Sequence, residues 1–173
     1  MSAKNLLPRF IPLKAGSNNH HARCIAVPSR LRAQPSPSRP LDGLRITVKD
    51  MFDIKGLRTS LGSREYLALC PLASATAPAI ETLVKAGVEV LGITKMCAMV
   101  GIQHPVQCVD FLAPFNPRGD GYQSPSGGNN GQAAAVAAYD WLDIAIGTDC
   151  NNFPFPSGLG SMTLAAHIVS RAH

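Results

Sequence analysis

The pattern of apolar and polar residues predicts three β-strands. Apolar and polar side chains alternate over residues 44–49, which is typical of a strand with one buried face. Residues 88–93 form a short apolar run that is consistent with a strand buried on both sides. Residues 141–147 are again apolar and short. We therefore expect strands in these three places.

Helical signals lie between and after these strands. Thr76 is placed to cap a helix with Pro78 in its first turn, and Gly87 suits the C-terminal end of that helix. Residues 131–139 are rich in alanine and predict a second helix. Residues 162–171 are compatible with a third, weakly amphipathic helix. The alternation of strands and helices predicts an α/β fold with a mixed, mainly parallel sheet flanked by helices.

Length and composition are those of one globular domain. The chain has 173 residues, of which 46% are hydrophobic and 16% are charged. An apolar run of about 18 residues, as a membrane span needs, is absent. Residues 5–13 are apolar but contain two prolines and an arginine, which makes a poor secretory signal. We expect no membrane partner and a cytoplasmic protein.

Positive charge is concentrated at the N-terminus. The first acidic residue is Asp42, and these basic residues precede it: Lys4, Arg9, Lys14, Arg23, Arg30, Arg32 and Arg39. The segment is also rich in proline. An organelle transit peptide or a nucleic-acid-binding tail would have such a composition, but we favour an extended arm that packs over the core. We therefore divide the chain into a basic, Pro-rich arm (1–41) and an α/β domain (42–173), with no nucleic-acid partner.

The five cysteines are scattered. They are Cys24, Cys70, Cys97, Cys108 and Cys150. Their spacing shows neither a Cys-x-x-Cys pair nor a zinc pattern, which favours free thiols in a reducing compartment. We expect no metal site and no cofactor.

A glycine-rich loop carries the strongest functional signal. Residues 124–132 read SPSGGNNGQ, an alanine-rich stretch follows, and residues 144–149 read IAIGTD. LRITVKD at 44–50, LGITK at 91–95 and FNPRGDGYQSP at 115–125 stand in the same order as matching segments of a known family. Over residues 23–153 the chain resembles the amidase signature family, and the residues of its motifs are similar to those of fungal members. These enzymes are serine hydrolases with a Ser-Ser-Lys triad.

The resemblance implies a role for each triad position. Lys49 matches the catalytic lysine, which must be neutral and desolvated to accept a proton. Without the resemblance, a surface lysine at a strand end, paired with Asp50 or Asp53, is the favoured interpretation, and the resemblance reverses it. The bridging serine falls at Gly128 and the nucleophile at Phe153. Because serine and base act as a unit, we do not expect ordinary amide hydrolysis.

Other groups remain near this loop. Amides at a helix N-terminus and in the loop near position 150 could stabilise an oxyanion. The candidate binding residues are Gly127, Gly128, Asn129, Asn130, Asn151, Asn152 and Phe153. For the asparagines, left-handed turn geometry is an equally good explanation. Ser126 and Cys150 are alternative nucleophiles, although a structural, buried cysteine is the simpler interpretation of Cys150.

Three functions follow from these observations. The first is a degenerate amidase homologue that performs acid–base chemistry on a small carbonyl-containing molecule, with Lys49 as the base. The second is a non-catalytic pseudoenzyme that binds a ligand or a partner chain. The third is a residual hydrolase using Ser126 or Cys150. Since the family's sheet continues beyond the region of resemblance, we also expect a homo-oligomer or a partner chain at the sheet edge.

Overall fold

A mixed four-stranded sheet forms the centre of the computed structural model, which describes residues 25–100, 108–118, 128–148 and 164–165. The strands are β1 (Arg45–Lys49), β2 (Glu89–Thr94), β3 (Ile144–Ile146) and β4 (Leu164–Ala165). Their order is β2-β1-β3-β4; β1 is parallel to β2 and β3, whereas β4 is antiparallel to β3. The predicted fold class is confirmed.

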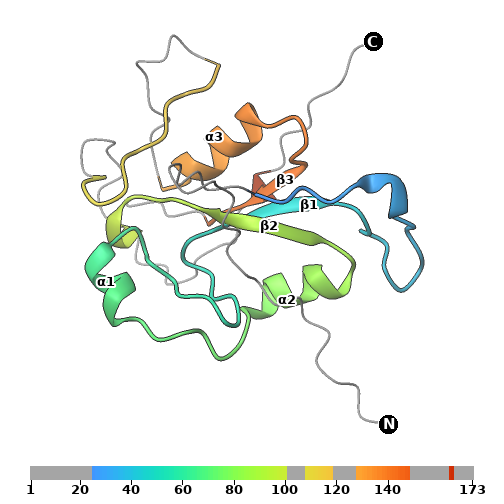
Figure 1. Ribbon diagram of the computed structural model, residues 1–173, viewed down its shortest axis with the longest axis horizontal. Helices are drawn as coiled ribbons and strands as arrows, with labels where there is room; N and C mark the ends of the chain where they lie inside the picture. Colours follow the sequence, from blue (N-terminus) through green and yellow to red (C-terminus); the bar gives the residue numbers. More distant parts are fainter. Residues whose placement is uncertain (1–24, 101–107, 119–127, 149–163, 166–173) are drawn as a thin grey trace, which may run out of the picture.

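Helices cover both faces of the sheet. The helical elements are η1 (Arg30–Arg32), α1 (Arg64–Leu69), α2 (Pro78–Lys85), η2 (Ala98–Val100) and α3 (Asn130–Ala138). Helix α2 connects β1 to β2 and lies on one face, and α3 lies on the opposite face on the way to β3 (Figure 1). After β1 the chain forms β2 on one side of β1, and it later forms β3 on the other side. The carboxyl end of β1 is therefore a topological switch point. Ligands bind at such points in open α/β sheets.

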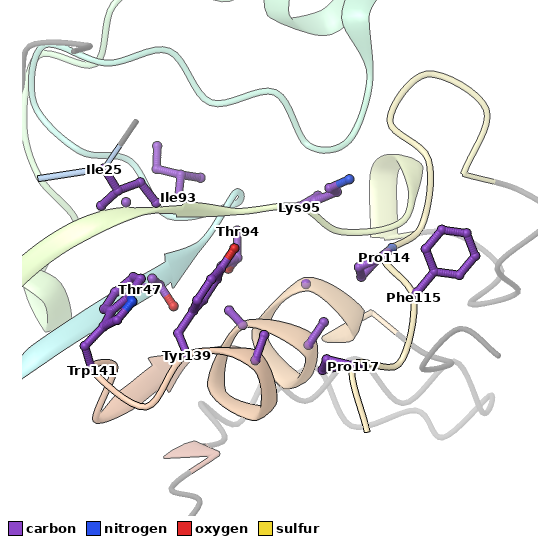
Figure 2. Close-up of a pocket in the computed structure, with 15 residues that line it drawn as sticks. Ile25, Thr47, Ile93, Thr94, Lys95, Pro114, Phe115, Pro117, Tyr139 and Trp141 are labelled. Atoms are coloured by element: carbon purple, nitrogen blue, oxygen red, sulfur yellow. The ribbon is translucent and has the colours of Figure 1, made fainter. Parts of the chain in front are cut away.

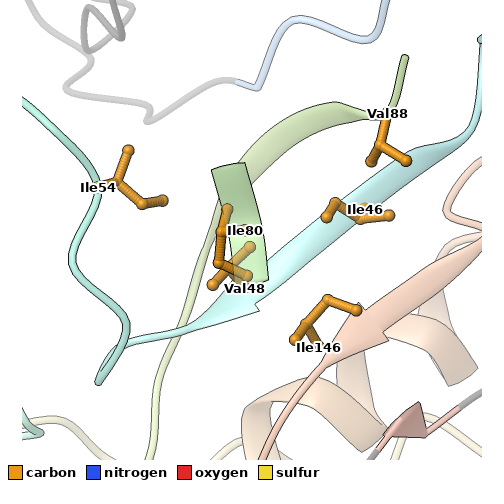
Figure 3. Packing of buried hydrophobic residues seen from close by; sticks show 6 residues of the cluster. All are labelled: Ile46, Val48, Ile54, Ile80, Val88 and Ile146. Atoms are coloured by element: carbon orange, nitrogen blue, oxygen red, sulfur yellow. The ribbon is translucent and has the colours of Figure 1, made fainter. Parts of the chain in front are cut away.

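The hydrophobic core lies between the sheet and α2. Its buried members, which Figure 3 shows, are Ile46, Val48, Ile54, Ile80, Val88 and Ile146. Ile46 and Val48 point to the α2 face because alternate side chains of a strand share one face. This is the buried face that the alternating pattern predicts.

The opposite face of β1 is buried as well, which corrects the expectation of one buried face. Arg45, Thr47 and Lys49 are 8%, 4% and 0% exposed. These three side chains lie on the face of the sheet that α3 covers, where they are shielded from solvent. Binary patterning assigns polar positions to solvent, but here tertiary packing covers them. Helix α3 contacts β1, and the Arg45 guanidinium donates to the carbonyl oxygens of Pro28 and Trp141. A strand with three polar side chains is therefore central in the sheet.

The helices differ in detail from the prediction. Helix α2 has Ala77 as its N-cap, and Thr76 does not cap it. The Thr76 hydroxyl accepts a hydrogen bond from the backbone N–H of Lys55 at 3.0 Å instead, so it ties the preceding loop. Helix α1 was not predicted, although Ser63 caps it by accepting from the N–H of Tyr66 at 3.3 Å. Helix α3 agrees with the prediction within one residue at each end.

The expected C-terminal helix is wrong where the structure describes it. Leu164–Ala165 form β4, which pairs antiparallel with β3. Pairing with an exposed strand edge satisfies backbone groups that a helix there would leave unpaired on β3. The rest of the segment 162–171 lies outside the described residues.

The described part of the arm contacts the α/β core. Arg30 forms an ion pair with Asp143 and donates to the carbonyl oxygen of Trp141 at 3.3 Å. The carbonyl oxygen of Pro28 accepts a hydrogen bond from the guanidinium of Arg45. The arm contacts the core through these groups; its boundary near residue 41 stays a prediction.

Candidate functional site

The candidate site is formed where β1 and β3 end side by side. Val48 pairs with Ile146 in the parallel register, so the residues that follow each strand meet at the same edge. Lys49 is fully buried, and its Nζ donates to the hydroxyl of Thr148 at 2.8 Å. That hydroxyl also lies 3.0 Å from the sulfur of Met51. The long lysine side chain is thereby held inside the protein with its nitrogen directed to the loop after β3.

Asn129 holds this loop from the start of α3. Its Nδ2 donates to the carbonyl oxygen of Thr148 at 2.8 Å, and its Oδ1 accepts from the Thr148 N–H at 3.3 Å. Gly147 makes the close approach possible, because a Cβ there would lie 2.5 Å from Asn129 Oδ1. Asn129 therefore fixes the position of the group that receives the Lys49 hydrogen bond.

Neither described asparagine of the glycine-rich loop adopts left-handed geometry. Asn129 has φ −110°, and Asn130 is the first residue of α3. The side chain of Asn130 is 3% exposed and donates to the sulfur of Cys108 at 3.7 Å. Turn geometry thus does not explain these two asparagines. Their amides hold segments that are distant in sequence.

A second polar contact joins α3 to β2. Gln132 is fully buried, and its Nε2 donates to Thr94 Oγ1 at 2.8 Å. The Thr94 hydroxyl in turn donates to the carbonyl oxygen of Val48 at 3.2 Å. This chain of bonds connects α3, β2 and β1 beside Lys49 and fixes α3 relative to the parallel strands.

The N-terminus of α3 is packed tightly on the end of β2. A Cβ added at Gly131 would lie 2.8 Å from the backbone nitrogen of Lys95 and closer still to its carbonyl oxygen. Real Cβ atoms do not approach backbone atoms this closely, so only glycine allows α3 to begin here. The position of the glycine-rich loop is set by this contact.

Asp50 anchors the loop that follows Lys49. Its carboxyl accepts from the Ser60 N–H at 2.9 Å and from the Ser60 hydroxyl. Burial raises the pKa of the Asp50 carboxyl above its ordinary 3.8, although the two hydrogen bonds from Ser60 act in the opposite direction. The carboxyl therefore holds the loop at Ser60 and is partly removed from water.

We expect the substitution Asp50→Asn to remove a pH-dependent loss of stability. Because the pKa of Asp50 is raised on folding, its contribution is fully present below pH 3.8 and is lost as pH rises through the folded-state value. An amide oxygen can accept from the Ser60 N–H, and the amide nitrogen can donate to the Ser60 hydroxyl. The free energy of unfolding of the wild type should therefore fall relative to that of the variant as pH rises.

Urea unfolding at pH 4 and pH 7 measures this difference. Asp140→Asn is the control, since Asp140 is exposed. Equal pH dependence in wild type and Asp50→Asn would contradict the prediction.

Comparison with known proteins shows the family of this chain. Residues 19–151 match the sequence profile of the family described as Amidase. The chain belongs to the amidase family. It is 37% identical over 134 residues to Amidase 1 of Arabidopsis thaliana, covering 77% of this chain and 31% of that protein. It is 36% identical over 116 residues to a glutamyl-tRNA(Gln) amidotransferase subunit of Natronomonas pharaonis, covering 67% of this chain and 26% of that protein.

Solved structures of the family share the fold. A structure from a vestigial protein complex, related to the origins of an s-triazine catabolic enzyme, has a TM-score of 0.59 at 31% identity and covers 66% of this chain and 24% of its own. The S177A allophanate hydrolase of Kluyveromyces lactis has a TM-score of 0.56 at 26% identity, with 66% and 18% covered. The chain thus spans about a quarter to a third of the curated amidase-family relatives named above.

The structure describes part of the predicted site. Lys49 and Asn129 both form hydrogen bonds with Thr148, and Gly128 and Asn130 flank Asn129 in the chain. The remaining predicted residues lie outside the described part of the chain: Ser126, Gly127, Cys150, Asn151, Asn152 and Phe153. The alternative of Lys49 as a surface lysine is wrong, because the side chain is fully buried.

Sequence analysis missed the hydrogen-bond partners of the site. Thr148, Thr94 and Gln132 were not assigned a role, although Thr148 stands directly after a predicted strand. Cys70 and Cys108 are free thiols, as their spacing predicts. Among the described residues, His, Cys, Asp and Glu side chains form no group of three that could hold a metal ion. Within the same residues, every helix is too short or too polar to cross a bilayer.

Proposed function

We propose that this amidase homologue transfers protons on a small carbonyl-containing molecule, with Lys49 as the base and without a serine nucleophile. One observation carries the proposal. Lys49 is completely buried at the switch point of the sheet, and its nitrogen is held by Thr148. Lysine is one of the side chains that transfer protons when they are positioned beside a reacting group.

Backbone amides at the N-terminus of α3 are placed to stabilise negative charge on the substrate carbonyl oxygen. The first N–H groups of a helix have no partner within the helix and carry a partial positive charge. Helix α3 begins at Asn130, directly after Gly128 and Asn129. Asn129 does not cap α3, because its side chain is bonded to Thr148. Negative charge that develops on a carbonyl oxygen would be stabilised at such a helix end.

The residues at the two serine positions argue against ordinary hydrolysis. By the resemblance to the family, Gly128 stands at the bridging serine and Phe153 at the nucleophile. We expect no adduct when the folded protein is incubated with a fluorophosphonate and its intact mass is measured. A single adduct on Ser126, or on Cys150, would instead support the residual hydrolase.

Deuterium exchange tests the proton transfer itself. Malonamide has an acidic methylene between two amide carbonyls, and NMR in D₂O follows the loss of its methylene signal. We expect the protein to accelerate exchange above the rate in buffer. Exchange at the buffer rate, from folded protein that forms no fluorophosphonate adduct, would contradict base chemistry and favour the non-catalytic pseudoenzyme.

A partner chain is a further part of the proposal. The relatives include one component of an amidotransferase and a member of a protein complex. Strand β2 stands at the end of the described sheet, and Ile93 on it is 37% exposed. Such an edge favours pairing with a second copy or another chain. The cytoplasmic location and a place in fungal biosynthesis stay predictions.

A further inference from the structure

A pocket separate from Lys49 opens between the sheet and α3. Its volume is about 310 Å³, which is within the range of small-molecule sites. Thr47 and Gly92 line it from the sheet, and α3 lines it with Ala134, Ala135 and Ala138. Lys49 is not among the described residues that line it. The pocket adjoins the candidate site, because Thr94 and Gly131 line it, but it is distinct from the position of the Lys49 side chain.

The lining of the pocket suits an aromatic ring. Thr47, Gly92, Ile93 and Thr94 line it from the sheet, and three alanines line it from α3. We call the space between the sheet and these alanines the slot. Tyr139 and Trp141 stack on each other at one end, with ring centroids 4.8 Å apart and planes 24° apart. Figure 2 shows this pair beside Thr47, and Pro114 and Phe115 at the other end. Aromatic and proline side chains are good partners for the edges of an aromatic ligand.

A buried hydroxyl without a partner marks where a polar group would bind. Thr47 is 4% exposed, and its Oγ1 has no hydrogen-bond partner within the described part of the chain. A buried hydroxyl without a partner is unfavourable, and one that lines a pocket can be satisfied by a ligand. Lys95 is the charged residue among the described lining residues, and its ammonium donates to the carbonyl oxygen of Leu112 at 2.9 Å. The other described lining residues carry no charge, which favours a neutral ligand.

We propose that this pocket binds a neutral, planar aromatic molecule whose single polar substituent forms a hydrogen bond with Thr47. The molecule lies in the slot between Gly92 and the alanines of α3, with its ring next to Tyr139 and Trp141. The inference goes beyond the proposed proton transfer and does not depend on Lys49.

Trp141 provides the measurement, because it is the one tryptophan of the chain. The probe is 4-nitrobenzyl alcohol, whose nitroaromatic ring quenches tryptophan fluorescence on contact. We expect quenching that saturates with probe concentration. Ala135→Leu fills the slot and should raise the half-saturating concentration at least about tenfold, as a steric block of the pocket implies. The matched control is Ala133→Leu on the same helix, since Ala133 is exposed and does not line the pocket.

A second comparison tests the role of the hydroxyl. Thr47→Val keeps the shape of the side chain and removes its oxygen, and we expect it to weaken the alcohol about three- to tenfold. The probe 4-nitrotoluene lacks the alcohol, so it should bind wild type and Thr47→Val equally. Quenching that rises linearly without saturation, or an unchanged midpoint in Ala135→Leu, would overturn the site. Equal weakening of both probes by Thr47→Val would overturn the hydrogen bond.

Discussion

The substitution Lys49→Met is expected to reduce malonamide exchange at least about 100-fold, to the rate in buffer. A positioned general base contributes roughly 10²–10⁴ in rate. Methionine is similar in length and apolar, so it fills the buried space without the nitrogen that bonds to Thr148. The loss should therefore appear in activity while the chain remains folded, which thermal unfolding monitored by circular dichroism verifies.

Two further variants separate base chemistry from structure. Lys55→Met removes an exposed lysine of the following loop and should leave the exchange rate unchanged. Thr148→Val keeps Lys49 but removes its hydroxyl partner, and we expect a loss of about tenfold or less, as one hydrogen bond implies. Lys49→Met that keeps more than about half of the wild-type rate would refute the assignment of Lys49 as the base.

The substitution Gly131→Ala is expected to lower the free energy of unfolding by about 2 kcal/mol or more. In most helices this change stabilises by about 1 kcal/mol, because glycine is a poor helix former. Here the added Cβ would lie 2.8 Å from the Lys95 nitrogen and closer to its carbonyl oxygen. Backbone cannot move aside as a flexible side chain can, so the clash displaces α3.

Urea unfolding of the variants measures this effect. Gly92→Ala is the control, because the nearest atom to its added Cβ is the flexible Cδ1 of Ile25 at 3.9 Å. We expect Gly92→Ala to change the free energy of unfolding by about 0.5 kcal/mol or less. A Gly131→Ala variant as stable as the wild type would show that α3 can begin without this close contact.

Local patterns identified most of the elements but not all their limits. The strand at 44–49 and the alanine-rich helix followed from short-range periodicity and propensity, which act along the chain itself. Thr76 was misassigned as a cap because a threonine hydroxyl serves a helix or a loop equally well. Its actual donor, the N–H of Lys55, lies 21 residues earlier, and a local pattern carries no information about such a contact.

In the candidate site, the sequence predicted the lysine but not its hydrogen-bond partners. A lysine at the end of a predicted strand, followed by a family-like order of motifs, was sufficient to select Lys49. Its partner Thr148 lies 99 residues away and is brought close by the parallel pairing of β1 with β3. Asn129 was assigned to a turn or to a ligand, whereas its amide holds Thr148. Strand pairing decides such contacts, and single-residue patterns do not encode it.

The sequence by itself determined the α/β class, the places of β1, β2, β3, α2 and α3, and the position of the lysine at a strand end. The tertiary structure decided which faces are covered. Alternation along β1 predicts one buried face, but α3 packs on the polar face too and buries Lys49 and Thr47. The same packing leaves the pocket beside Thr47. Hydrophobic periodicity shows which residues of a strand differ from their neighbours in polarity. The burial of a residue depends on which element packs over it. Only the folded arrangement of α3 on the sheet determines this.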